Sequence, residues 1–271
     1  MTFLERLDAA ANTNDSWLCL GLDPDPALVP EGVGVAEFLR IVVDATSDLV
    51  CCFKPNIAFF EALGLDGQRA LRSVLAAMPA QVPVLIDAKR GDTPHTMRAY
   101  ARAIFDDLGA DAVTVSPYLG GDALAPFLER ADRGVFVLCK TSNPGAGEIQ
   151  DLEVRGSPLF VHVARRALEW DQHGTVGFVV GATYPSDVAA VRQVAPGRPI
   201  LLPGVGAQAG DLEASVRAGV DEHGARAIVN ASRTILYASR VADWQSAARN
   251  EADRLRQAIN AARLESAAPT R

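Results

Sequence analysis

The sequence predicts a single (β/α)8 barrel, the TIM-barrel fold, over residues 1–271. Eight short apolar segments are each followed by a helical segment, and this alternation indicates a parallel sheet covered on both faces. Polar residues follow nearly every one of these strands, as they do at the mouth of a barrel. A doubly wound open sheet is the alternative, but no Gly-x-Gly-x-x-Gly opens the first helix.

The elements follow one another in a regular order from the N-terminus. A short amphipathic helix is predicted over 1–12, with Phe3, Leu4 and Leu7 on one face. The predicted strands are the apolar runs 17–22, 49–53, 84–86, 112–115, 135–139, 176–180, 200–202 and 227–229. The helices between them are predicted over 36–47, 59–78, 94–108, 121–131, 158–170, 186–194 and 211–218.

The two ends of this pattern and one long connection differ from the rest. A long helix is predicted over 241–265, followed by a frayed tail over 266–271. The connection from Thr141 to Ser157 contains several Gly and Pro residues and is predicted to be a long loop. Loops of this length either close over an active site or decorate the surface, and the composition fits both roles.

Composition excludes several classes of function. The 271 residues are 49% hydrophobic and 22% charged, which suits a globular protein with a full core. No apolar run reaches the length of a membrane span, and the N-terminus lacks a signal pattern. The net charge of -7, without a basic stripe, argues against nucleic-acid binding. The four cysteines lie in apolar runs without metal-ligand spacing, which predicts buried, reduced thiols in a cytoplasmic protein.

The most informative stretch runs from Val84 to Thr93, where an apolar strand ends in charged residues. Asp87 and Lys89 are two positions apart, so both side chains point to the same side of the strand. Asp92 follows on a loop, because Gly91 breaks the strand and a helix is predicted to begin after Thr93. A structural ion pair would explain one acid beside one base, but the three charges of Asp87, Lys89 and Asp92 within six positions favour a functional site.

Other polar residues follow the remaining strands, and a barrel would bring them to the same mouth. These residues are Asp23, Lys54, Asn56, Ser142, Gln208 and Arg233. The turn from Gly204 to Gly206 leaves backbone N–H groups uncovered, and Arg233 adds a cation with two donors. Loops after the last two strands of a barrel are the usual phosphate site, so a phosphate-binding site is expected here.

Taken together, these motifs resemble the orotidine 5′-phosphate decarboxylase family. The resemblance rests on Gly21-Leu22-Asp23-Pro24, Phe53-Lys54-Pro55-Asn56, Asp87-Ala88-Lys89-Arg90-Gly91-Asp92-Thr93, Pro203-Gly204-Val205-Gly206-Ala207-Gln208 and Arg233. The insertion beginning Thr141-Ser142-Asn143-Pro144-Gly145 is similar to that of the longer bacterial subgroup. The resemblance implies a homodimeric barrel enzyme that converts orotidine 5′-phosphate into UMP and CO2 in pyrimidine synthesis, with no metal ion and no cofactor.

The resemblance also implies a role for each catalytic residue. Lys89 would be the general acid that protonates the pyrimidine carbon losing CO2. Asp87, Asp92 and Lys54 would surround it in an alternating network of charges. Asp92 and Thr96 would be donated by the partner subunit across the dimer interface.

The remaining residues would bind the substrate. Asp23 and Lys54 would hold the ribose hydroxyls, with support from Asn56. Gln208, Arg233 and the backbone at Gly206 would grip the phosphate. The pyrimidine would be contacted by Ser142, although Thr141 could fill the same place.

Three other functions fit parts of the pattern. A phosphosugar decarboxylase or aldolase of the same superfamily would use a metal ion with the acids at the strand ends. Schiff-base chemistry at Lys89 is disfavoured, because the neighbouring acids keep that lysine charged. A barrel that only senses a nucleotide phosphate would bind its ligand without consuming it.

Overall fold

The computed structural model describes residues 1–204 and 211–267. Its main sheet has eight parallel strands in the order β2-β1-β10-β9-β8-β5-β4-β3. Isolated bridges from Phe53 to Val84 and from Asn56 to Asp87 join the two outer strands, β2 and β3, and so close the barrel. The strands are β1 (Leu18–Leu22), β2 (Cys52–Pro55), β3 (Leu85–Arg90), β4 (Ala112–Val115), β5 (Gly134–Lys140), β8 (Val176–Val180), β9 (Ile200–Leu202) and β10 (Ala227–Ala231). The predicted eight-stranded barrel is confirmed.

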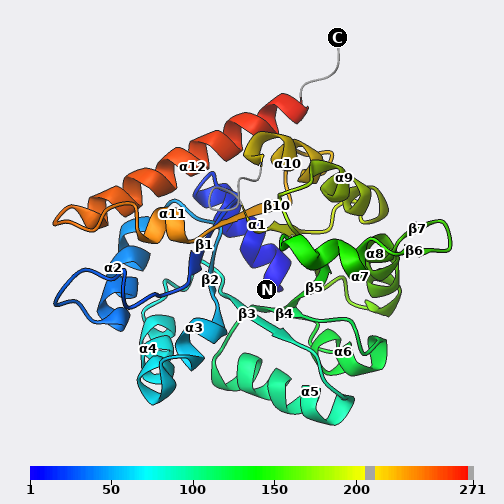
Figure 1. The fold of residues 1–271 in the computed structure, drawn as a ribbon, viewed down its shortest axis with the longest axis horizontal. Coiled ribbons are helices and arrows are strands. Elements are labelled where there is room, and N and C mark those ends of the chain that lie inside the picture. Colours follow the sequence, from blue (N-terminus) through cyan, green and yellow to red (C-terminus); the bar gives the residue numbers. More distant parts are fainter. Residues whose placement is uncertain (205–210, 268–271) are drawn as a thin grey trace.

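Helices surround the strands in an outer ring (Figure 1). They are α2 (Val35–Thr46), α3 (Ile57–Glu61), α4 (Gly64–Ala76), α5 (Pro94–Ala101), α6 (Gly121–Leu128), α8 (Leu159–Trp170), α9 (Pro185–Val194), α10 (Leu212–Gly219), α11 (Arg233–Leu236) and α12 (Trp244–Ala267). A π-helical turn, η1 (Arg102–Asp107), continues α5. Because the strands are largely apolar up to their carboxyl ends and the helices present an apolar stripe, the core fills both the barrel and the layer around it.

Helix α1 (Phe3–Thr13) covers the amino-terminal end of the barrel. Phe3 packs edge-on against Phe136 of β5, with the ring centroids 5.7 Å apart. Gly134 makes this contact possible, because a Cβ atom there would lie 2.4 Å from the Phe3 ring. With one end closed in this way, the carboxyl ends of the strands form the open mouth.

Two predicted segments differ from the structure. The helix expected over 59–78 is divided into α3 and α4, because Gly64 adopts a left-handed φ of +63° and Gly67 packs against the carbonyl of Phe60. The loop expected from Thr141 to Ser157 contains regular structure: η2 (Pro144–Ala146), α7 (Gly147–Gln150) and a hairpin of β6 (Glu153–Val154) and β7 (Ser157–Pro158). Local contacts that composition does not reveal stabilise both segments.

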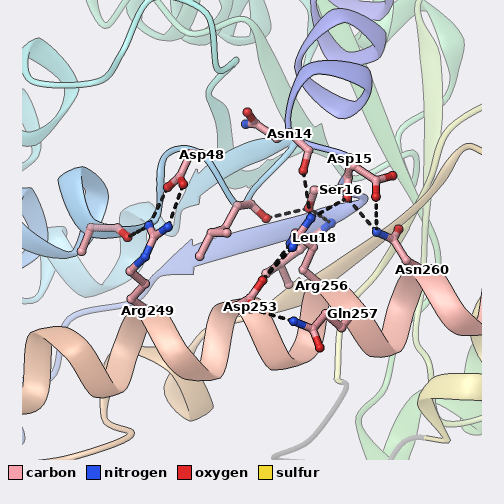
Figure 2. Close-up of polar contacts among 12 residues, drawn as sticks. Asn14, Asp15, Ser16, Leu18, Asp48, Arg249, Asp253, Arg256, Gln257 and Asn260 are labelled. Atoms are coloured by element: carbon pink, nitrogen blue, oxygen red, sulfur yellow. Dashed lines mark hydrogen bonds and ion pairs between the residues drawn. The ribbon is translucent and has the colours of Figure 1, made fainter.

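Helix α12 is attached to the barrel through an apolar face and a polar edge. Its buried residues recur every three or four positions and are Ala248, Ala252, Leu255, Ile259 and Ala262. Figure 2 shows the polar edge, where Arg249 pairs with Asp48 at 2.6 Å and Asn260 donates to the backbone oxygen of Asp15 at 2.7 Å. The first contact fixes the helix against the connection between α2 and β2, and the second fixes it against the connection between α1 and β1. Of the predicted frayed tail, 266–267 belong to α12 and 268–271 lie outside the described residues.

Two expectations from composition can be compared with the structure. All four cysteines are buried free thiols, as predicted. Burial raises the pKa of the Cys139 thiol, which keeps it protonated. Within the described ranges, no helix has both the length and the apolar character needed to cross a bilayer.

Candidate active site

Asp87 is the centre of a hydrogen-bonded group of charges at the carboxyl end of β3. One carboxylate oxygen accepts a hydrogen bond from the Lys54 ammonium at 3.2 Å. The other accepts from the Lys89 ammonium at 2.6 Å and from the Thr114 hydroxyl at 2.8 Å. Strands β2, β3 and β4 therefore each supply a donor to a single carboxylate.

The pKa values of this group show that the charges stabilise one another. Burial by itself raises the pKa of Asp87, but the charges of Lys54 and Lys89 and the hydrogen bonds outweigh it and lower this pKa to about 2. Burial acts the other way on Lys54, yet the carboxylates of Asp87 and Asp23 raise its pKa above the ordinary value. At neutral pH Asp87 is therefore a buried carboxylate, and Lys54 beside it is a buried ammonium.

Lys89 adopts an unusual backbone conformation that brings its side chain to Asp87. Its φ is +46°, in the left-handed region, and the pairing of β3 with β4 shifts register between Ile86 and Arg90. The Thr114 hydroxyl accepts the backbone N–H groups of both Ala88 and Lys89 at 3.0 Å. Backbone strain of this kind costs about 1–3 kcal/mol and is concentrated at functional sites. The side chain of Lys89 is 49% exposed, so its ammonium lies at the rim of the mouth.

A cavity of about 470 Å³ opens beside this group, at the carboxyl ends of the strands. Six residues predicted from sequence line it: Asp23, Lys54, Asn56, Asp87, Ser142 and Arg233. Lys89 does not line the cavity in the described chain, but it is bonded to Asp87, which does. The cavity is wide enough for a small polar ligand, since ligand pockets begin near 300 Å³.

Asp23 and Asn56 both line the cavity, but only Asn56 has a hydrogen-bond partner for its side-chain oxygen among the described residues. The Oδ1 atom of Asp23 is buried and has no hydrogen-bond partner among the described residues. Asn56 caps α3, where its side-chain oxygen accepts the Ala58 N–H at 3.2 Å. Because a buried acceptor without a partner costs free energy, Asp23 is prepared to receive a donor from a ligand.

The expected phosphate site is described only in part. Arg233 begins α11 and is exposed, and its side chain makes no hydrogen bond or ion pair within 1–204 and 211–267. Gly204 and Ser232 line the cavity beside it. The predicted contacts at Gly206 and Gln208 lie outside the described residues.

Asp92 and Thr96 lie apart from the buried charges. Asp92 accepts the backbone N–H of Thr93 at 2.6 Å, and no bond in the described chain joins it to Lys89 or Asp87. Thr96 lies in the first turn of α5, half-buried, and this helix begins after Thr93 with Pro94 in its first turn, as predicted. Among the described residues, neither Asp92 nor Thr96 lines the cavity.

The structure separates the two candidates for the base contact. Ser142 lines the cavity, whereas the Thr141 hydroxyl donates to the side chain of Asn143 at 2.6 Å. Thr141 also receives a hydrogen bond from Gln150 at 2.9 Å. Since its hydroxyl is already engaged, Thr141 is the weaker candidate and Ser142 the stronger one.

Sequence reasoning missed several residues of the site, among them Thr114, Asn230 and Tyr237. Thr114 fixes Asp87 and the backbone of Lys89, and Asn230 lines the cavity. The Tyr237 hydroxyl accepts the Asp25 N–H at 2.7 Å and donates to the Asp23 carbonyl at 3.3 Å, so it holds the loop after β1. A lone hydroxyl in an apolar strand could have revealed Thr114, but no local pattern marks Tyr237.

Among the side chains of the described ranges, no group of three or more His, Cys, Asp or Glu residues is arranged to hold a metal ion.

Comparison with known proteins gives consistent results. Residues 16–248 match the model of a family described as orotidine 5′-phosphate decarboxylase / HUMPS. The orotidine 5′-phosphate decarboxylase of Roseiflexus castenholzii is 54% identical over 269 residues, which cover 97% of this chain and 98% of that protein. The enzyme of the same name from Thermomicrobium roseum is 51% identical, with 98% and 97% covered. The solved structure of Leishmania donovani OMP decarboxylase superposes with a TM-score of 0.85 at 41% identity, covering 97% of this chain and all of that one.

Proposed function

The chain belongs to the orotidine 5′-phosphate decarboxylase family, and we propose that it converts orotidine 5′-phosphate into UMP and CO2 with Lys89 as the proton donor. The observation that carries this proposal is the ammonium of Lys89, held 2.6 Å from the carboxylate of Asp87 at the mouth of the barrel. We propose that the reaction needs neither a metal ion nor a cofactor.

In this reaction the bond between the pyrimidine ring and the substrate carboxylate breaks, and its electron pair stays on the ring carbon. From the rim of the mouth, the Lys89 ammonium would stabilise this negative charge as it develops and would transfer a proton to the same carbon. Its side chain is 49% exposed, so the neutral amine regains a proton from solvent after product release. Asp87 keeps the ammonium in place before the reaction through their ion pair.

Magnitudes favour stabilisation of the carbanion over repulsion of the substrate. The carbanion left by CO2 has no adjacent electron sink, so the uncatalysed barrier is high. The enzyme must lower the activation free energy by an amount toward the upper part of the general range of about 8–23 kcal/mol. Repulsion between Asp87 and a substrate carboxylate at about 4 Å supplies only about 4 kcal/mol at an effective dielectric constant near 20. The larger share must come from the fixed positive charge of Lys89 and from binding energy at the phosphate.

The rest of the cavity supports binding of the nucleotide. Asp23, with its unpartnered buried oxygen, and Lys54 would hold the ribose hydroxyls, with Asn56 beside them. Ser142 would contact the base. Arg233 would grip the phosphate together with Gln208 and the backbone at Gly206.

Arg233→Ala is expected to reduce kcat/KM mainly by raising KM. A guanidinium bound to a phosphate contributes to both ground state and transition state, so its loss weakens binding of the whole nucleotide. Steady-state kinetics should give a rise in KM of about 10-fold to 100-fold, in line with a lost charged hydrogen bond of about 1.5–3 kcal/mol. An unchanged KM would remove Arg233 from the phosphate site.

We also propose that the enzyme is a homodimer in which Asp92 and Thr96 complete the site of the partner subunit. In support, Asp92 makes no bond to Lys89 or Asp87 within its own chain. The test mixes two inactive variants, Lys89→Ala and Asp92→Ala, under conditions of subunit exchange. One site of each mixed dimer would regain both residues, so about a quarter of wild-type activity should return. No recovery in dimers shown to have exchanged subunits would contradict the shared site.

The function itself is tested by incubating the purified protein with orotidine 5′-phosphate in EDTA and following the loss of the orotate chromophore. The expected result is full conversion to UMP, with a rate that chelation does not change. Loss of activity on exhaustive chelation would favour a metal-dependent enzyme of the same superfamily. Binding without consumption of the substrate would identify the chain as a sensor.

A further inference from the structure

Ser142 lies between two cavities. It lines the cavity of the candidate active site, whereas its neighbours Lys140 and Asn143 line a second cavity of about 360 Å³. The second cavity also includes Asp151 and Asp187. None of its charged residues takes part in the chemistry proposed above, so their presence at the strand ends needs another explanation.

Lys140 is a buried cation at the end of β5. Its side chain is 3% exposed, and its ammonium forms an ion pair with Asp151, just after α7. The carboxylate of Asp187 in α9 lies 4.0 Å away, and the ring of Phe160 has its centroid at 5.7 Å. Because a buried ammonium is costly without a partner, this pair ties the segment around α7 to the end of the strand.

The next residue along the chain makes a second link to the same segment. The Thr141 backbone N–H donates to the side-chain oxygen of Gln150 at 2.8 Å, and the amide of Gln150 donates back to the Thr141 hydroxyl at 2.9 Å. Lys140 and Thr141 are thus bonded to Asp151 and Gln150, two adjacent residues. Both links immediately precede Ser142, which leaves that residue little freedom.

The neighbouring strand limits Ser142 from another side. Gly181 follows β8, and its N–H donates to the Lys140 carbonyl at 2.8 Å. A Cβ atom on Gly181 would lie 3.0 Å from the backbone N, the Cα and the Cβ of Ser142. A side chain at Gly181 would push the two segments apart by a few tenths of an ångström, so glycine there lets Ser142 pack against the end of β8 while it lines the active-site cavity.

We propose that Lys140 is a positioning residue: its ion pair with Asp151, together with the Thr141–Gln150 link, holds the Ser142 hydroxyl against the base of the substrate. This inference rests on the proposed function, which assigns the base contact to Ser142. Lys140 itself touches no reacting atom. A displacement of about 1 Å at a positioned group can reduce the rate by about 100-fold. The ion pair between Lys140 and Asp151 can therefore influence turnover from outside the active-site cavity.

A double-mutant cycle tests whether Lys140 acts through Ser142. Lys140→Met and Ser142→Ala are each expected to reduce kcat/KM for orotidine 5′-phosphate by about 10-fold to 100-fold. The double variant should be no more than about threefold worse than Ser142→Ala alone, because a residue that acts through another adds nothing once that other is gone. Losses that multiply, or an unchanged kcat/KM in Lys140→Met, would overturn the proposal.

A milder variant guards against misfolding of Lys140→Met. Asp151→Asn removes only the charge of a half-exposed partner, so it should fold and show the same direction of change. Glu148→Gln removes the same charge from α7 without touching Lys140 and should retain wild-type kinetics. If Asp151→Asn and Glu148→Gln have the same kcat/KM, the ion pair between Lys140 and Asp151 does not position Ser142, and the proposal is wrong.

Ligand binding separates a positioning role from general loosening of the barrel. Lys140→Met should weaken the binding of UMP, which carries the base, and leave the binding of ribose 5-phosphate unchanged. Equal weakening of both ligands would mean that the ion pair only supports the fold, which contradicts the proposal. A wild-type protein that leaves orotidine 5′-phosphate intact would refute the proposed function, whereas an active wild type with multiplying losses would refute this inference alone.

Discussion

Lys89→Ala is expected to lower kcat by at least about 1,000-fold, since one preorganised donor at a developing charge is worth about 100-fold to 1,000-fold and Lys89 also supplies the proton. The loss should not come from unfolding. The Lys89 side chain is half-exposed, and Asp87 keeps the Lys54 ammonium and the Thr114 hydroxyl as partners when Lys89 is removed.

The measurement is turnover of orotidine 5′-phosphate together with the affinity for UMP. UMP affinity should change little, because the phosphate and ribose contacts remain. Arg69→Ala, which removes an exposed cation paired with Asp66 on α4, is the matched control and should keep wild-type turnover. Normal turnover by Lys89→Ala would remove the proposed mechanism.

Asp87→Asn is expected to reduce both activity and stability. The substitution keeps the shape of the side chain but removes the negative charge shared by the Lys54 and Lys89 ammonium groups. Breaking a buried pair costs about 3–5 kcal/mol, and kcat should fall by at least about 100-fold because Lys89 loses the partner that places it. Urea unfolding and steady-state kinetics measure the two effects.

Asp111→Asn is the control that separates loss of activity from loss of stability. Asp111 is also a buried carboxylate between two cations, Arg6 and Arg133, but it precedes β4 at the closed end of the barrel. Its substitution should lower the free energy of unfolding by a similar amount and leave kcat unchanged. A fall in kcat of equal size in both variants would mean that Asp87 matters only for the fold.

The stability difference between wild type and Asp87→Asn should also depend on pH. The folded state lowers the pKa of Asp87 from 3.8 to about 2, so this group stabilises the fold at all pH values above the ordinary pKa. That stabilisation is lost as the pH falls from about 4 to about 2, and at about 1.4 kcal/mol per pKa unit it amounts to about 2 kcal/mol. Urea titrations across this range should show the difference between the two proteins narrowing by that amount, and a constant difference would contradict the lowered pKa.

The barrel could be predicted from the sequence because its signals are local. An apolar run such as 176–180 can be satisfied only by burial on both faces, and the turns between strands and helices are marked by Gly, Pro and polar residues. The predicted helix over 59–78 was wrong as one element, since the break at Gly64 depends on a close approach of Gly67 to Phe60. A contact of this kind does not change the spacing of apolar residues, so the sequence pattern does not reveal it.

The sequence predicted which residue types form the candidate site, but it did not predict all of the bonds between their side chains. The positions of Asp87 and Lys89 in the sequence indicated a pair facing the same side of a strand, and the two side chains are bonded. Strict alternation did not predict the left-handed φ of Lys89 or the register shift between Ile86 and Arg90 that accompany this pair. Lys54 joins the pair only because the barrel closes between β2 and β3.

The order of residues along the chain is enough to place polar side chains at the carboxyl ends of the strands, because an apolar run precedes each of them, even though β2 and β3 continue through Lys54 and Lys89. Which of these side chains contact one another depends on the folded arrangement of the strands: Lys54 is bonded to Asp87, Thr141 is bonded to Gln150, and Ser142 lines the cavity. The reason is physical. Burial is a property of each residue and its neighbours in sequence, whereas charge pairing depends on distances across strands that no local pattern contains.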